Sequence, residues 1–140
     1  MRRRKGDAVG ADFTAVRRVS NGRRSPRRIL LIEPSRVDRL LVNTALVLKG
    51  RDETRLTEVT DLDLGLSLLL QRPYDLVMLA DRAANQSPWE TTRAIRAVAP
   101  TTPIIRHAPY LAEPAGNDNG LDQLVEAVET ALAEALAKAS

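Results

Sequence analysis

The chain has 140 residues, enough for one domain built around one hydrophobic core. It contains no cysteine and one histidine, which excludes disulfide bonds, thiolate metal sites and metal sites built from several histidines. No stretch is apolar enough for a membrane span or a secretory signal, so the expected location is the cytoplasm and no membrane span is expected.

The first 28 residues differ in charge from the rest of the chain. They hold ten basic residues and two aspartates, about +8, so about −5 remains for the other residues out of a total of +3. We expect a disordered basic arm over residues 1–28 and one domain over residues 29–140, because the arm cannot bury enough apolar surface to offset chain entropy. Such an arm can bind nucleic acid through phosphate contacts or bind anionic lipid, or it can simply be a solvated tail. The basic residues are Arg2, Arg3, Arg4, Lys5, Arg17, Arg18, Arg23, Arg24, Arg27 and Arg28.

Residues 29–33 form a short apolar run that ends in an acid, Glu33, and predict a buried strand. Pro34 ends this strand, and Ser35 can cap a helix that continues to Lys49, with Gly50 as its C-cap. The apolar stripe expected for this helix recurs at helical spacing and comprises Val37, Leu40, Leu41, Thr44, Ala45 and Leu48.

Residues 54–60 alternate between polar and apolar and predict a second, more exposed strand. A second helix is expected over residues 61–71. Gly65 lies inside this helix and costs it up to about 1 kcal/mol relative to alanine. The residues expected to face inward from this helix are Leu62, Leu66, Leu69 and Leu70.

Residues 76–80 form a second continuous apolar run, typical of a strand buried on both faces of a parallel sheet. A loop of mostly small or polar residues follows, over residues 81–87. Ser87, Pro88 and Glu90 then combine a cap, a first-turn proline and a capping box, which predicts a third helix over about residues 88–98. In open α/β sheets, ligands bind at such loops, where the strands end.

A fourth strand is expected over residues 102–108. Only Pro109 separates it from residues 110–113, and a parallel crossover needs a dozen or more residues. Residues 108–119 are therefore expected to form a loop. A last helix, capped by Asp118 or Asn119, should run to about Lys138, with an apolar stripe of Leu121, Leu124, Val125, Val128, Leu132, Ala135 and Leu136.

The segment from Tyr74 to Arg96 resembles the centre of a receiver domain of two-component response regulators (CheY-like), which reads roughly DLVLLDLxMPGxDGxELLxxLR. The match has no gap, and residues 102–108 and 110–114 resemble the later motifs TPVIxLTA and YLxKP. The resemblance implies that four positions of the phosphoryl chemistry have changed. The phosphoacceptor aspartate falls on Ala80, a metal-binding acid on Pro34, the hydroxyl residue on Ala108 and the lysine on Glu113.

The resemblance implies a three-layer α/β sandwich with a central parallel sheet, flavodoxin/CheY-like. The short spacing after the fourth strand predicts that this fold is shortened to about four strands. Their expected order is 2-1-3-4. We expect it to lack the fourth helix and to have an irregular fifth strand, with Tyr110 to Glu113 unable to pair beside the fourth strand.

The resulting hypothesis is a degenerate receiver, or pseudo-receiver, that is not an enzyme and needs no cofactor. It would act without phosphorylation by binding a protein partner, either another signalling protein or a second copy. Two alternatives stay open. One is a nucleic-acid-associated regulator that uses the basic arm. The other is a phosphoaccepting regulator that uses Asp81 with Mg²⁺, although Glu33 alone makes a weak magnesium site.

Two further residues, one histidine and one tryptophan, are candidates for a functional role. His107 ends the fourth predicted strand and is interpreted as a hydrogen-bonded surface group rather than a base. Trp89 lies at the start of the third predicted helix and is interpreted as a core residue or a staple.

Overall fold

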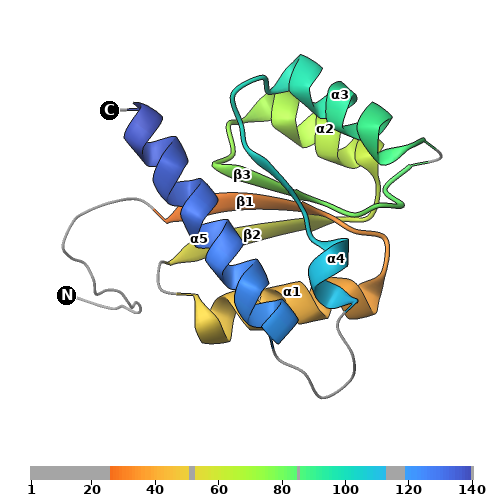
Figure 1. Ribbon diagram of the computed structural model, residues 1–140. Coiled ribbons are helices and arrows are strands. Elements are labelled where there is room, and N and C mark those ends of the chain that lie inside the picture. The colour runs from red at the N-terminus through yellow and green to blue at the C-terminus, as the bar shows by residue number, and fades with distance from the viewer. Residues whose placement is uncertain (1–25, 51–52, 85, 113–118, 140) are drawn as a thin grey trace, which may run out of the picture.

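The computed structural model describes residues 26–50, 53–84, 86–112 and 119–139. Within them, the chain forms a parallel sheet of four strands in the order β2-β1-β3-β4 (Figure 1), which confirms the predicted order. The strands are β1 (Arg27–Ile32), β2 (Thr54–Val59), β3 (Leu76–Leu79) and β4 (Ile104–Arg106).

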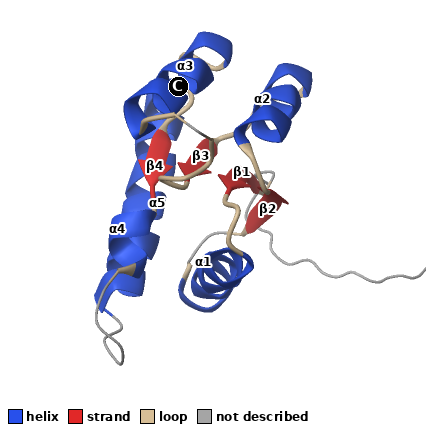
Figure 2. Cartoon of the chain, turned by 90° about the vertical axis from the view of Figure 1, so that its right-hand side faces the viewer, coloured by secondary structure: helices blue, strands red, loops and turns tan. Residues whose placement is uncertain are grey.

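Helices cover both faces of this sheet, so the chain is a three-layer α/β sandwich as predicted. Figures 1 and 2 show α2 and α3 on one face and α1, α4 and α5 on the other. The helices are α1 (Arg36–Lys49), α2 (Leu62–Gln71), α3 (Pro88–Val98), α4 (Ala108–Leu111) and α5 (Asn119–Ala139).

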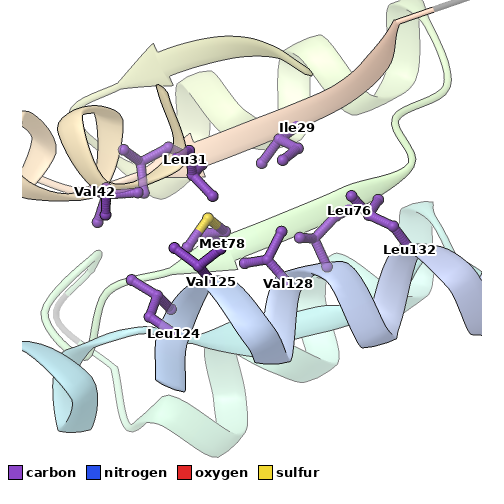
Figure 3. Packing of buried hydrophobic residues seen from close by; sticks show 11 residues of the cluster. Ile29, Leu31, Val42, Leu76, Met78, Leu124, Val125, Val128 and Leu132 are labelled. Carbon is purple, nitrogen blue, oxygen red and sulfur yellow. The ribbon is translucent and has the colours of Figure 1, made fainter. Parts of the chain in front are cut away.

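The two central strands divide their side chains between two cores. From β1, Ile29 and Leu31 pack toward α1 and α5, as Figure 3 shows, while Leu30 and Ile32 pack toward α2 and α3. β3 repeats this alternation, and its four residues are fully buried. A strand covered on both faces must be apolar at every position, which explains the continuous apolar runs in the sequence.

The predicted starts of α1 and α3 are confirmed. Ser35 Oγ accepts a hydrogen bond of 3.2 Å from the backbone N–H of Asp38 at the start of α1. At α3, Ser87 Oγ accepts from the Glu90 N–H at 3.2 Å, and the Glu90 carboxylate accepts from the Ser87 N–H at 3.0 Å. These contacts satisfy backbone donors that have no partner inside the helix.

β1 begins two residues earlier than predicted. The Arg27 N–H donates to the Glu53 carbonyl at 3.1 Å, and the buried Arg27 guanidinium donates to the carbonyl of Leu132 in α5 at 3.0 Å. Arg27 Nε also lies 3.7 Å from the Asp75 carboxylate. Arg27 is therefore part of the fold and not of a basic arm. Arg28 also lies in β1, and residues 1–25 of the predicted arm lie outside the described residues.

The segment after β4 differs from the predicted loop. Residues 108–111 form a short helix, α4, with Pro109 in its first turn, where a missing N–H costs nothing. The Tyr110 N–H donates to the His107 carbonyl at 3.0 Å, and Tyr110 and Leu111 pack against the core beneath α5. The fourth helix is thus shortened to one turn rather than lost. Tyr110 and Leu111 are helical, not a fifth strand, and Glu113 lies outside the described residues.

One inward residue of α2 was predicted wrongly. Leu62 and Leu69 are buried, but Leu70 is 75% exposed. Gly65 is buried where α2 crosses β1, and a Cβ added there would lie 2.5 Å from Ile32 Cδ1 and 2.9 Å from Ile32 Cγ1. The glycine therefore allows α2 to approach β1 closely, which offsets its poor helix propensity.

We predict that Gly65→Ala lowers the free energy of unfolding by roughly 1 kcal/mol, because a clash costing about 1–3 kcal/mol exceeds the propensity gain of about 1 kcal/mol. Chemical denaturation measures this change. The control is Ser67→Ala, at an exposed position of the same helix, which should change stability by less than about 0.5 kcal/mol. A stabilised Gly65→Ala variant would show that Ile32 can move aside.

Candidate functional site at the carboxyl edge of the sheet

The strand register brings three predicted site residues into one row. Ile32 of β1 is in register with Leu79 of β3, and Leu79 is in register with Arg106 of β4. The next residue along each strand is Glu33, Ala80 or His107. Because β3 lies between β1 and β4, Ala80 lies between Glu33 and His107 in this row.

A buried hydrogen bond joins the two ends of the row. His107 Nε2 lies 2.7 Å from Glu33 Oε1, and the exposed fractions of the two residues are 0% and 4%. Neighbouring strands are about 4.8 Å apart, so these two side chains reach across the position of Ala80 to meet. The alanine methyl is small enough to leave that path open, whereas a larger side chain at position 80 would compete for it.

The Glu33 carboxylate is also tied to the start of α1. Its Oε2 accepts a hydrogen bond from the Ser35 N–H at 2.9 Å. Arg39 Nη1 donates to the carbonyls of Glu33 and Pro34 at 2.8 and 3.1 Å. Both carboxylate oxygens therefore have partners, as a buried charged group requires.

His107 was predicted to be a hydrogen-bonded surface group. The hydrogen bond is present, but His107 is fully buried, so the surface placement was wrong. Its Nδ1 has no hydrogen-bond partner among the described residues. The position of His107 in the sequence could have predicted its burial. A polar residue directly after a buried parallel strand lies beside the residues that follow the neighbouring strands.

Asp81 lies apart from this buried pair. Its Oδ1 accepts hydrogen bonds from Arg106 Nε at 3.0 Å and Arg106 Nη2 at 2.5 Å. Both side chains of this pair are partly exposed. The carboxylate proposed as a substitute phosphoacceptor is thus held by an arginine on the neighbouring strand, while the Glu33 carboxylate is held by His107 and Ser35.

The residues at this edge do not fit a magnesium ion of the receiver type. Pro34 and Ala80 carry no carboxylate, and both oxygens of Glu33 are already hydrogen-bonded. Magnesium prefers an octahedral shell built from one or two carboxylates, water and phosphate oxygens. Within the described part of the chain, no group of three or more histidines and acids could hold a metal ion.

Two other sequence interpretations change. Trp89 is 66% exposed, so it is not a core residue, and Arg93 lies 4.8 Å above its ring centroid. Among the proposed nucleic-acid residues, Arg27 is buried and bonded to the fold, which corrects its assignment, and Arg28 lies in β1. The remaining eight basic residues lie outside the described part of the chain.

None of the described helices has the length and apolar character needed to cross a membrane. No family model matches the sequence, and no curated protein matches it.

Three solved structures share the fold. A transiently phosphorylated "switch" in bacterial signal transduction is 17% identical, with a TM-score of 0.60 over 79% of this chain and 97% of that one. The signal receiver domain of an HD domain-containing protein from Pseudomonas fluorescens Pf-5 is 22% identical. Its TM-score is 0.65 over 86% of this chain and 96% of that one. The phosphorylated cyanobacterial phytochrome response regulator RcpA is 18% identical. Its TM-score is 0.55 over 75% of this chain and 92% of that one. At these identities the similarity establishes the fold.

We predict that His107→Ala lowers the free energy of unfolding by about 3 kcal/mol, because it leaves the buried Glu33 carboxylate without one partner. Arg106→Ala, one residue away, removes a partly exposed ion pair and should cost at most about 1 kcal/mol. Urea denaturation of both variants measures the difference. Equal losses would show that the buried pair contributes no more than the exposed one.

Proposed function

We propose that this chain, which has the receiver-domain fold, is a protein-binding module that phosphorylation does not switch. It works by binding a partner rather than by catalysing a reaction. The observation that carries this proposal is the row Glu33–Ala80–His107 at the carboxyl edge of the sheet.

The row supports the proposal in two ways. First, the central position is an alanine, which has no nucleophile to accept a phosphoryl group. Second, the residues on either side of Ala80 are joined by a buried hydrogen bond that needs no ligand. A receiver that responds to phosphorylation needs an acceptor and a free pocket around it, and here a contact between protein side chains takes their place.

The same contact supports a single conformation of the nearby elements. The Glu33 carboxylate accepts a hydrogen bond from Ser35, the residue directly before α1, and His107 directly precedes α4. The pair therefore connects the start of α1 to the start of α4 across the sheet. A surface formed by these helices would be presented to a partner at all times.

The structures that share the fold suggest the kind of pathway in which this chain acts. Their names describe a phosphorylated switch in bacterial signal transduction, a signal receiver domain and a phytochrome response regulator. We place this chain in the same kind of pathway, two-component signalling in the bacterial cytoplasm. Its partner would be another signalling protein or a second copy of the chain.

The Asp81 alternative receives less support from the geometry. The carboxylate would have to leave its two-pronged contact with Arg106 and enter a site whose acid, Glu33, is already bonded. No observation on the described residues favours the nucleic-acid alternative, which depends on the basic residues of segment 1–28, eight of which lie outside the described residues.

We predict that incubation with acetyl phosphate and Mg²⁺ adds no phosphoryl group to this protein, because Ala80 cannot accept one and Asp81 is held by Arg106. Intact mass spectrometry measures the outcome. A receiver that is phosphorylated under the same conditions serves as the positive control.

An adduct that disappears in Asp81→Asn would contradict the proposal and make the protein a phosphorylation switch. An adduct that persists in Asp81→Asn would identify a different acceptor and contradict it equally.

A further inference from the structure

The outward side of α3 carries an exposed tryptophan. Trp89 is 66% exposed, whereas the other two aromatic residues of the described chain, Tyr74 and Tyr110, are buried or half-buried. An exposed indole leaves a large apolar surface in water, and tryptophan and arginine are enriched among the residues that dominate binding energies at interfaces. One exposed apolar residue is normal on a protein surface, so the residues around Trp89 decide whether it marks a contact site.

Two arginines follow Trp89 on the same side of the helix. Trp89, Arg93 and Arg96 are four and three residues apart, so they lie one above another along α3, and both arginines are exposed. The Arg93 guanidinium carbon lies 4.8 Å from the centroid of the Trp89 ring. A cation over an aromatic face is attracted to it, so each of these two side chains helps to hold the other in place. We call Trp89, Arg93 and Arg96 the α3 stripe.

The two arginines of the α3 stripe have no acidic partner among the described residues. Other basic side chains are paired, as Arg39 is with Glu58 and Arg106 with Asp81. The one acid within α3, Glu90, accepts a hydrogen bond of 3.0 Å from the Ser87 N–H in the capping box. The α3 stripe therefore presents two positive charges that the described part of the chain does not compensate.

α3 holds the stripe on a rigid support. On its inner side Thr91 and Ile95 are fully buried, and Figure 1 shows α3 at the outer boundary of the molecule, beside α2. The capping box fixes the first turn, and the Ala99 N–H donates to the Ile95 carbonyl at 2.7 Å at the other end. A surface that is already ordered loses little conformational entropy when a partner binds.

α1 exposes more apolar surface than α3 but shows no chemistry that selects a partner. Its buried side consists of Val42, Ala45 and Leu46. Of the apolar stripe predicted for α1, only Ala45 is buried, so that prediction assigned the stripe to the wrong side of the helix. The exposed large residues carry no charge and no hydrogen-bonding group, and they are Val37, Leu40, Leu41, Val47 and Leu48.

The chemistry of the α3 stripe suits a protein segment that carries carboxylates beside an apolar residue. Guanidinium groups bind carboxylates through paired hydrogen bonds, and an apolar side chain can cover the indole. Nucleic acid is also anionic, but tight binding takes more phosphate contacts than two arginines supply. Residues 29–140 hold eleven basic and sixteen acidic residues, about −5 in net charge, which opposes a long polyanion.

We propose that the α3 stripe binds an acidic segment of a partner protein, with carboxylates on Arg93 and Arg96 and an apolar side chain on the indole of Trp89. This inference names the kind of partner that the binding module proposed above would take, and it rests on that function. Its test does not involve phosphorylation. A phosphoryl adduct would refute the proposed function and leave the binding result unaffected, whereas absent binding would refute this inference alone.

Trp89 is the only tryptophan of the chain, so its fluorescence reports binding at α3 and not at the basic N-terminal residues. The probe is a synthetic peptide of glutamate, leucine and alanine, titrated into the full chain. We expect a saturable shift of the Trp89 emission that weakens as salt is added, because salt screens exposed charges. The same peptide with lysine in place of glutamate should give no shift.

Arg96→Glu should weaken binding of the glutamate peptide by roughly tenfold, because it places like charges opposite one another. The matched control is Arg55→Glu, the same change at an exposed arginine of β2, which should alter binding by less than about twofold. Circular dichroism should show that both variants fold. If Arg96→Glu does not fold, Arg96→Gln removes the charge without adding an acid and should weaken binding by roughly threefold.

The proposal is overturned if the glutamate peptide leaves the Trp89 emission unchanged, or if the lysine peptide shifts it equally. It is also overturned if Arg96→Glu and Arg55→Glu weaken binding alike. A single-stranded oligonucleotide serves as the competing anion. If it shifts the Trp89 emission at lower concentration than the glutamate peptide does, the α3 stripe binds nucleic acid and the proposal fails.

Discussion

The structure depends on the burial of β1 and β3 from both sides. Their side chains alternate between a core with α1 and α5 and a core with α2 and α3, so each strand position must be apolar. This constraint fixes the order of the layers, because neither face of the central pair can meet water. It also fixes where polar chemistry can occur, since the first residues free to be polar come where these strands end.

The pair of Glu33 and His107 lies at that boundary and is still buried. Burying a carboxylate is costly unless hydrogen bonds satisfy it, and here a histidine and a backbone N–H do so. In the receiver fold this edge holds the phosphoryl chemistry. In this chain a protein contact occupies the same position, with alanine between its two partners.

α1 connects this edge to the outer surface of the molecule. Its first turn is attached to the Glu33 segment through Ser35 and Arg39, and its inner side joins the core with α5. Its outer side carries large apolar residues that the described part of the chain leaves exposed. A helix held rigidly on one side can present the other side without an ordering cost when a partner binds.

The sequence by itself determined the positions of the central strands and of most helices, because apolar periodicity and caps such as Ser87 are local properties. The strand order and the significance of the alanine at position 80 came from the resemblance to receiver domains. It predicted wrongly that Leu70 faces inward and that His107 lies on the surface. Tertiary structure alone decided that Glu33 meets His107, 74 residues away, because strand register arises from pairing between distant segments. It also decided which side of α1 is covered, since periodicity shows that a helix surface is apolar but not which neighbour, if any, packs against it.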